Sequence, residues 1–230
     1  MEYAPAISQV ATLLADPKRS ALLWALIDGA SRGGDELARL AGVSLTSAGA
    51  HLSRLCAAGL LTPEARGRKR YFRIAGPEVG AAVEALAHVS FISAPRPSQP
   101  VECGSPVTAA MRQARCCGEH LGGEVAAALL QQLLARRWLE REGQQLRLTP
   151  RGASGLAAKG VFVQALPARE RQRATLCEGW CGAGAHIGGA LGACLLRTAL
   201  QMNWLRRVEG ARAFEVTRQG REALARLGEG

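Results

Sequence analysis

The first quarter of the chain contains three stretches in which apolar residues recur three or four positions apart, the spacing of one face of an α-helix. The first stretch begins at Pro17, the second ends at Gly42, and the third extends from Ser44 to Gly59. Proline is tolerated in the first turn of a helix, serine is a favourable N-cap, and glycine suits the turn that follows a helix. The pattern predicts three helices, the last two joined by a tight turn.

A segment rich in basic residues follows the third predicted helix. Residues 66–73 are Arg-Gly-Arg-Lys-Arg-Tyr-Phe-Arg, which places five positive side chains among eight residues. On a two-stranded ribbon, such side chains neutralise DNA phosphates while the small polar residues of the preceding helix contact base edges in the major groove. The alternative is a solvated hairpin tip. The winged helix-turn-helix interpretation favours double-stranded DNA as a partner, with wing contacts at Arg66, Arg68, Lys69 and Arg70.

Three motifs carry a family resemblance. Residues 14–26 follow L-x-D-P-x-R-x-x-L-L-x-x-L, residues 36–44 follow E-L-A-x-x-x-G-V-S, and residues 51–61 follow H-L-x-x-L-x-x-A-G-L-L. In this order, and with the basic segment, they resemble the arsenic-repressor-like (ArsR) family of winged-helix transcriptional regulators over roughly residues 6–90. The resemblance implies a homodimer that binds a pseudo-palindromic operator. It places the following residues on the DNA-facing helix: Ser44, Thr46, Ser47, Ala50, His51 and Arg54.

The chain departs from the family at its metal sites. Residues 35–41 contain no Cys-x-Cys, and the helix after the wing offers only Glu84 and His88 as ligands. Neither standard metal site of the family is therefore present. His51 also has two interpretations, because a histidine followed by Leu52 and Leu55 serves either as a DNA contact or as a partly buried packing residue.

The second half of the chain contains an internal repeat. His120-Leu-Gly-Gly and Trp138-Leu recur as His186-Ile-Gly-Gly and Trp204-Leu, both with an offset of 66 residues. Each copy predicts a long helix, a strand, a turn at glycine and a return strand, which is the order of a winged helix. We expect the helix of the first copy to lie in a core or a dimer interface, because it is apolar at Leu121, Val125, Ala128, Leu129 and Leu133.

The predicted fold class is mainly α with small β-wings (α+β), an N-terminal winged helix-turn-helix followed by two degenerate winged-helix-like repeats. Four prolines between residues 94 and 106 mark a linker, because proline breaks helices. The predicted domains are a DNA-binding domain at 1–93, the linker at 94–106, and repeats at 107–165 and 166–230. Together, residues 107–230 are predicted to be a sensor and dimerisation domain.

Cysteine and histidine residues gather just ahead of the helix of each repeat. Cys117 and His120 stand three positions apart, so one helical turn would direct both to the same side. Thiolate and imidazole donors suit Zn²⁺ or another soft divalent metal, and closely spaced cysteines also form sensing disulfides or capture thiol-reactive species. Each cysteine is alternatively a small buried apolar residue. The candidates for metal or thiol sensing are Cys116, Cys117, His120, Cys177, Cys181 and His186.

This half resembles a subgroup of longer ArsR-like regulators. Their repeats carry Cys-x-x-His-Leu-x-Gly and Cys-x-x-Trp…His-Leu-x-Gly-x-Leu-Gly, and the resemblance implies no particular effector. The matching positions are Cys117, His120, Cys177, Trp180 and His186, whereas Cys116 and Cys181 are additional.

Composition agrees with a regulator that binds a polyanion. The net charge is +10, with 10 Lys and Arg against 8 Asp and Glu in residues 1–93 and 19 against 11 in residues 94–230. The excess in the second half either lengthens the DNA footprint or forms a solvated surface. No apolar run approaches the ~20 residues of a membrane span, and no signal peptide is evident, so we expect a cytoplasmic protein.

An enzyme is not expected, because the sequence has no phosphate-binding glycine loop, no paired carboxylates and no aspartate after Asp35. The sequence favours a homodimeric repressor that an effector releases from DNA through the Cys and His residues of the second half. Two alternatives remain for that half. It binds an organic effector in an apolar pocket, or it is only a structural dimerisation and DNA-clamping module.

Overall fold

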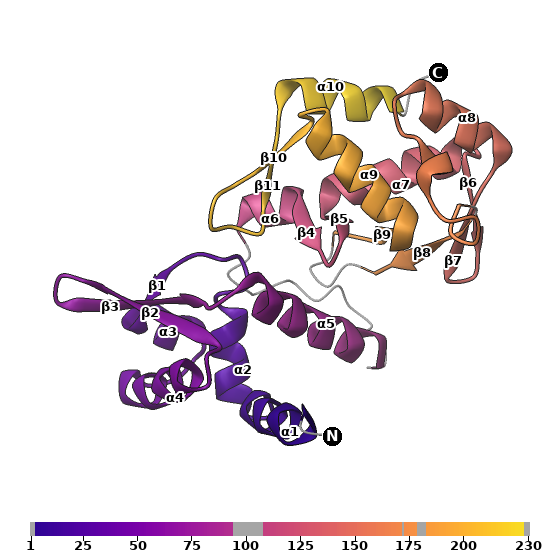
Figure 1. The fold of residues 1–230 in the computed structure, drawn as a ribbon. Coiled ribbons are helices and arrows are strands. Elements are labelled where there is room, and N and C mark those ends of the chain that lie inside the picture. The colour runs from indigo at the N-terminus through magenta and orange to yellow at the C-terminus, as the bar shows by residue number, and fades with distance from the viewer. Residues whose placement is uncertain (1–2, 94–107, 172, 179–182, 228–230) are drawn as a thin grey trace. The chain divides into compact units, whose positions relative to one another are not determined.

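The structure is a computed structural model that describes residues 3–93, 108–171, 173–178 and 183–227 (Figure 1). These residues form two compact units, of which the first contains the elements up to Leu86. The second contains the elements from Thr108 onward and the last turns of α5 (Pro77–Ser93). The predicted linker at 94–106 lies outside the described residues. Small antiparallel sheets accompany the helices, which confirms the predicted α+β class. Within the described ranges, no helix is long and apolar enough to cross a membrane.

The first unit packs helices against a three-stranded antiparallel sheet of order β1-β3-β2. In the β2–β3 ribbon, Leu61 pairs with Ile74 at the base and Arg66 pairs with Lys69 at the tip. One leucine from each predicted helix, Leu22, Leu37 and Leu55, is fully buried in the core, as the helical spacing of apolar residues predicts. The elements that precede α5 are α1 (Tyr3–Leu14), α2 (Pro17–Trp24), β1 (Arg32–Gly33), α3 (Gly34–Leu40), α4 (Leu45–Ala57), β2 (Leu61–Arg66) and β3 (Lys69–Ile74).

Helices α2 and α4 begin at side-chain caps. The Ser44 hydroxyl accepts a hydrogen bond from the Ser47 amide at 3.2 Å, and Gly59, just after α4, has a φ of 71°, in the region that favours glycine. At the start of α2, the Asp16 carboxylate accepts hydrogen bonds from two first-turn amides, including that of Arg19 at 3.0 Å. The Arg19 amide is the main cause that lowers the pKa of Asp16. The predicted cap at Ser44 is confirmed.

The second unit contains the same element order twice, which we call repeat 1 (residues 115–158) and repeat 2 (residues 173–227). Each is a strand pair, a long helix, a second strand pair and a final helix. Helix α6 (Ala109–Gln113) precedes repeat 1, and the 3₁₀ helix η1 (Val163–Ala165) lies between the repeats. Repeat 1 consists of β4 (Arg115–Cys117), β5 (His120–Gly122), α7 (Glu124–Ala135), β6 (Leu139–Glu142), β7 (Gln145–Leu148) and α8 (Pro150–Ala158). Repeat 2 consists of β8 (Arg173–Cys177), β9 (His186–Gly188), α9 (Gly189–Gln201), β10 (Leu205–Arg207), β11 (Phe214–Val216) and α10 (Arg218–Leu227).

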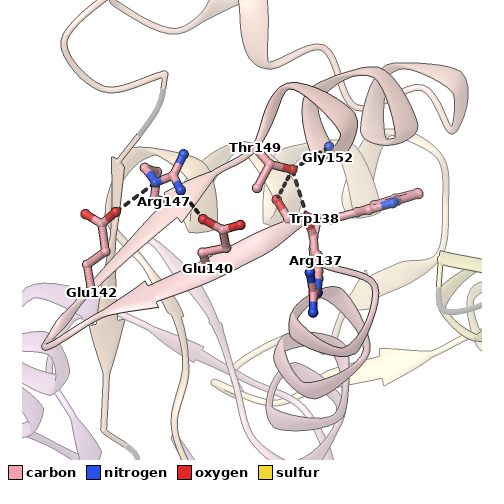
Figure 2. Close-up of polar contacts among 7 residues, drawn as sticks. All are labelled: Arg137, Trp138, Glu140, Glu142, Arg147, Thr149 and Gly152. Atoms are coloured by element: carbon pink, nitrogen blue, oxygen red, sulfur yellow. Dashed lines mark hydrogen bonds and ion pairs between the residues drawn. The ribbon is translucent and has the colours of Figure 1, made fainter.

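In each repeat, a threonine just before the last helix makes the same hydrogen bonds. In repeat 1 the Thr149 hydroxyl donates to the Arg137 carbonyl at 2.8 Å and accepts from the Gly152 amide at 3.0 Å (Figure 2). In repeat 2 the Thr217 hydroxyl donates to the Asn203 carbonyl at 2.8 Å. Arg137 and Asn203 have φ values of 56° and 55°, so the backbone makes the same left-handed step after both long helices. The two repeats therefore share local geometry as well as element order.

The long helix of each repeat packs against a strand of the other repeat. Helix α7 of repeat 1 lies against β9 of repeat 2, α9 of repeat 2 lies against β5 of repeat 1, and β5 lies beside β9. The four-stranded sheet also spans both repeats, with the order β6-β7-β8-β9. Leu129 and Leu133 of α7 are buried, as predicted for a core helix, whereas Ala128 is exposed. One hydrophobic core thus serves both repeats.

Candidate DNA-binding face and candidate Cys/His centre

Helix α4 presents a polar stripe and buries its opposite side. Thr46, Ala50 and Arg54, spaced four residues apart, are all exposed, whereas Leu52 and Leu55 are buried in the core. Residues four apart lie on one face of a helix, so these three side chains form a continuous exposed row. These three are exposed members of the set predicted to face DNA.

The three other residues predicted to face DNA, at the cap and on α4, have different surroundings. The Ser44 hydroxyl is engaged in capping the helix. His51 is half-buried, its Nδ1 is buried, and no described residue makes a hydrogen bond with that atom. Ser47, also half-buried, donates its amide to the cap. The exposed Thr46, Ala50 and Arg54 are therefore better placed for an external partner than Ser44, Ser47 and His51.

The wing is a tight hairpin with an exposed basic tip. Strands β2 and β3 are joined by Gly67 and Arg68, and Gly67 has a φ of 63°. Arg68, Lys69 and Arg70 are exposed. An open groove of about 490 Å³ lies between α4 and the wing, and its lining includes the exposed residues Gly49, Arg68 and Arg70. The positive charge of the wing therefore lies across this groove from Gly49 and Ser53 of α4.

Glu64, on β2, restrains part of this basic surface. Its carboxylate accepts hydrogen bonds from Arg66 and from Arg73, both at 2.8 Å. The bond from Arg66, followed by that from Arg73, lowers the pKa of Glu64. The Arg66 guanidinium also lies 4.9 Å from the centre of the Tyr71 ring. Sequence analysis missed Glu64, because a carboxylate among so many basic residues becomes informative only when the strand register is known.

The ribbon of repeat 1 differs from this wing in its charge. Arg147 of β7 pairs with Glu142 at 2.7 Å and also with Glu140, both on β6 (Figure 2). Acidic partners thus neutralise Arg147 on this ribbon, whereas the wing tip in the first unit exposes Arg68, Lys69 and Arg70, of which Lys69 lies 3.9 Å from the Asp35 carboxylate.

Four of the predicted sensing residues meet in the second unit. Cys117 on β4 is the cross-strand partner of His120 on β5, and Cys177 on β8 is the partner of His186 on β9. One donor atom from each residue lies within 4.8 Å of all the others, and the two sulfur atoms are 3.9 Å apart. The expectation that Cys117 and His120 share a helical turn is wrong. They face each other across a hairpin, which also directs both to one side.

Cys116 is not part of this cluster. Consecutive residues of a strand point to opposite faces, so Cys116 and Cys117 diverge. The Cys116 thiol instead donates to the Gly118 carbonyl at 3.1 Å. The vicinal pair therefore does not present its two sulfur atoms to one site. Cys181 and Trp180, which were also singled out, lie outside the described residues.

The cluster is buried, and two of its nitrogen atoms have no hydrogen-bond partner among the described residues. Cys117 and Cys177 are 5% and 7% exposed, and His186 is fully buried. The Nε2 atoms of His120 and His186 are both buried without such a partner, and the two rings lie 5.1 Å apart. His88, near the end of α5, places its Nε2 3.3 Å from the Cys177 sulfur.

Two glycines make room for the imidazoles. A Cβ atom added at Gly122 would lie 3.3 Å from Nε2 of His186, and one added at Gly188 would lie 3.4 Å from Cε1 of His120. Each histidine therefore packs over the glycine of the other repeat. The fully buried Arg115 is also adjacent, with its Cζ 3.5 Å from the same Gly122 position. Sequence analysis missed these residues, although alternation along β4 places residues 115 and 117 on one face.

The remaining space near the cluster is small. An apolar cavity of about 20 Å³ lies between the repeats, lined by residues that include Leu121, Leu129, Ile187 and Trp204. Pockets that hold organic ligands usually measure about 300–1,000 Å³. This cavity is too small for an organic effector, whereas a separate pocket of the second unit, of about 340 Å³ and lined by residues that include Leu148, Pro150 and Val163, lies within that range.

Comparison with known proteins decides the family. No protein-family model matches the chain. A protein of Bacillus subtilis (strain 168), described as the uncharacterized HTH-type transcriptional regulator YdfF, is 31% identical over 220 residues that cover 96% of each chain. The chain belongs to the HTH-type transcriptional regulators. This regulator is therefore a DNA-binding protein and not an enzyme, in agreement with the sequence analysis.

Solved structures that resemble the regulator cover about two fifths of it. A homodimeric winged helix-turn-helix domain from Mycobacterium bovis, described as a possible ArsR-family transcriptional regulator, is 26% identical, with a TM-score of 0.37, over 41% of the regulator and 87% of that chain. The cadmium sensor CMTR from Mycobacterium tuberculosis is 28% identical, with a TM-score of 0.32, over 40% of the regulator and 94% of that chain.

Proposed function

We propose that the protein is a cytoplasmic, homodimeric transcriptional repressor with its sensor in residues 107–230. In this proposal, two winged helices within residues 1–93 bind the half-sites of a pseudo-palindromic operator. The effector acts on the Cys/His cluster of Cys117, His120, Cys177 and His186. The observation that carries the proposal is the convergence of these four donor atoms within 4.8 Å from two separate repeats.

The DNA-binding half of the proposal rests on the exposed row of α4 and on the wing. Thr46 and Arg54 offer hydrogen-bonding groups to base edges, and Arg68, Lys69 and Arg70 offer positive charge to phosphates. Side chains that contact bases determine which sequence is bound, whereas phosphate contacts determine mainly affinity.

The sensing half requires the effector to favour one of two states of the protein. An effector that binds the DNA-free state more tightly than the DNA-bound state shifts the population away from the operator. Such coupling typically amounts to about 1–3 kcal/mol, or about 5–150-fold in operator affinity. The chemical requirement is a ligand that interacts with thiolates and imidazoles, namely a soft metal ion or a thiol-reactive species.

DNA binding is tested with operators selected from randomised duplexes and measured by fluorescence anisotropy. Arg54→Ala should relax specificity at one position of the operator, at a cost of about 1–3 kcal/mol. Arg68→Ala should weaken binding to all duplexes and lower the salt slope by about one. Arg226→Ala in α10 is the control and should change neither. Analytical ultracentrifugation of the free protein tests the dimer, and a monomer that binds selected and scrambled duplexes equally would refute this half of the proposal.

Sensing is tested on the same operators with Zn²⁺, Cd²⁺ and a thiol oxidant. We expect at least one of these agents to weaken operator binding by the wild-type protein. Cys177→Ser should abolish that response and keep operator binding intact, whereas Cys116→Ser should respond like the wild type. An unchanged response in Cys177→Ser would leave the second half as a clamp or as the receptor for another ligand.

A further inference from the structure

The Cys/His cluster is divided evenly between the two repeats. Each repeat supplies one cysteine and one histidine as a cross-strand pair, and the pairs approach through β5 and β9. Side chains of a cross-strand pair project to the same side of a hairpin. Two sulfur and two nitrogen donors therefore face one common point, from two segments about 60 residues apart in the chain.

The hydrogen-bonding state of the histidines indicates a missing ligand. Nε2 of His120 and Nε2 of His186 are both buried and have no partner among the described residues. A buried polar atom without a partner costs about 1–3 kcal/mol, and the cluster has two. On the other side of the His186 ring, Nδ1 lies 3.5 Å from the Gly184 carbonyl, so a proton on Nδ1 would leave the Nε2 lone pair available. A cation between the rings satisfies both atoms.

The burial of the sulfur atoms distinguishes between the two candidate effectors, a metal ion and a thiol-reactive compound. Reactive cysteines are solvent-accessible, because a thiol must reach an oxidant or an electrophile to react with it. Cys117 and Cys177 are 5% and 7% exposed, so a bulky electrophile has little access to them. A bare metal ion needs no such exposure once it is coordinated. Burial therefore favours a coordinated cation over covalent capture.

We infer that the Cys/His cluster is a closed four-coordinate site for one soft divalent cation of the Zn²⁺ class, and that this cation joins repeat 1 to repeat 2. The donor set of two thiolates and two imidazoles is one that Zn²⁺ adopts in tetrahedral sites. This inference deepens the proposed function by naming the ligand of the sensing site, but the binding step itself is independent of DNA.

Charge and shape both fit the inferred cation. The two thiols release their protons to solvent as they bind, and the two thiolates then balance the charge of the cation. The fully buried Arg115 lies beside Gly122, next to the cluster. Gly122 and Gly188 leave the space that the imidazoles occupy.

The inference is tested with Co²⁺, a spectroscopic substitute for Zn²⁺, added to the reduced, metal-free full-length protein. We expect one ion per chain, intense visible bands of tetrahedral Co²⁺ and a near-ultraviolet thiolate-to-cobalt charge-transfer band. Zn²⁺ should displace the cobalt and remove these bands. Weak octahedral bands, or no thiolate band, would overturn the inference.

Variants identify the ligands. Cys117→Ser and Cys177→Ser should each remove about half of the charge-transfer intensity and lower Zn²⁺ affinity at least ~10-fold, because even residues that only support ligands contribute about 10–100-fold. Cys116→Ser is the matched control, since its side chain points to the opposite face, and it should keep the full spectrum. Equal losses in Cys116→Ser and Cys117→Ser would overturn the assignment.

A further variant perturbs the site without removing a ligand. Gly188→Ala should lower Zn²⁺ affinity because the added Cβ would lie 2.8 Å from Oγ1 of Thr175 and 3.2 Å from Cβ of the ligand Cys177, so that the neighbouring strand must shift. Circular dichroism of every variant establishes that it is folded. Operator binding of the same samples is measured separately. If the wild-type protein gives the tetrahedral cobalt spectrum but binds no operator, the proposed function alone is refuted. If it binds its operator but gives no tetrahedral cobalt spectrum, the metal site alone is refuted.

Discussion

Cys117 and Cys177 place their sulfur atoms 3.9 Å apart, although 60 residues separate them in the chain. The contact arises because each cysteine ends the first strand of its repeat and pairs with the histidine that begins the next strand. The same local structure, built twice and packed face to face, brings equivalent residues together.

Metal binding should stabilise the second unit. A cation that binds only the folded state adds about 2.7 kcal/mol when its free concentration is 100 times its Kd. Differential scanning calorimetry of the reduced full-length protein, with and without Zn²⁺, should therefore show a higher Tm for the transition of the second unit. The shift should disappear in Cys117→Ser and persist in Cys116→Ser. An equal shift in both variants would point to adventitious binding elsewhere.

Glu64→Gln should raise affinity for DNA. The substitution releases Arg66 and Arg73 from their ion pairs and removes a negative charge from the wing. Each additional phosphate contact should steepen the salt dependence of the binding constant by about 0.9 in a log–log plot. Anisotropy titrations at several salt concentrations measure this slope. Glu78→Gln, an exposed change in the first turn of α5, is the control, and tighter binding by that variant would discount the role of the wing.

Gly220→Ala should destabilise the second unit by about 1–3 kcal/mol, the range for forcing extra atoms into a packed interior. An added Cβ would collide with the backbone carbonyl of Trp204, and the Gly220 amide is already held by Thr217 at 2.9 Å. Denaturant unfolding followed by tryptophan fluorescence measures the loss. Gln219→Ala, its exposed neighbour in α10, should be nearly neutral. A neutral Gly220→Ala would mean that the helix shifts to accept the methyl group.

Asp16→Asn should alter the acid stability of the first unit. The Arg19 amide, the largest contribution, lowers the pKa of Asp16 below its unfolded value of 3.8. A lowered pKa means that the stabilisation is fully present above the unfolded pKa and is lost as pH falls through the folded pKa. The variant keeps a cap acceptor but has no charge, so its stability should vary less with pH below about 4. Thermal melts of the wild type and the variant between pH 3 and about pH 7 test this. The same dependence of Tm on pH in both proteins would contradict the prediction.

Much of the first unit could be predicted from its sequence, because its signals are local. The cap at Ser44, the turn at Gly42 and the basic hairpin depend on residues close in the chain, and the structure contains each of them. The restraint that Glu64 places on Arg66 and Arg73 could not be predicted. It depends on which residues lie together on the ribbon, and therefore on strand register.

The Cys/His cluster was predicted in composition but not in geometry. A spacing of three positions between Cys117 and His120 fits one helical turn and equally a hairpin with a two-residue loop. Strands as short as β4 and β5 carry too few residues for an alternating pattern. The available signal was Gly118, whose φ of 57° suits the loop of a tight hairpin. Recognising that hairpin also separates Cys116 from Cys117.

The even division of donors between the repeats bears on shortened forms of the protein. A chain that ends after α8 would retain the winged helix but only one cysteine and one histidine of the four ligands. Two ligands bind a cation far more weakly than four. If such a fragment still occupied its operator, it would be a constitutive repressor that does not respond to the effector of the intact chain.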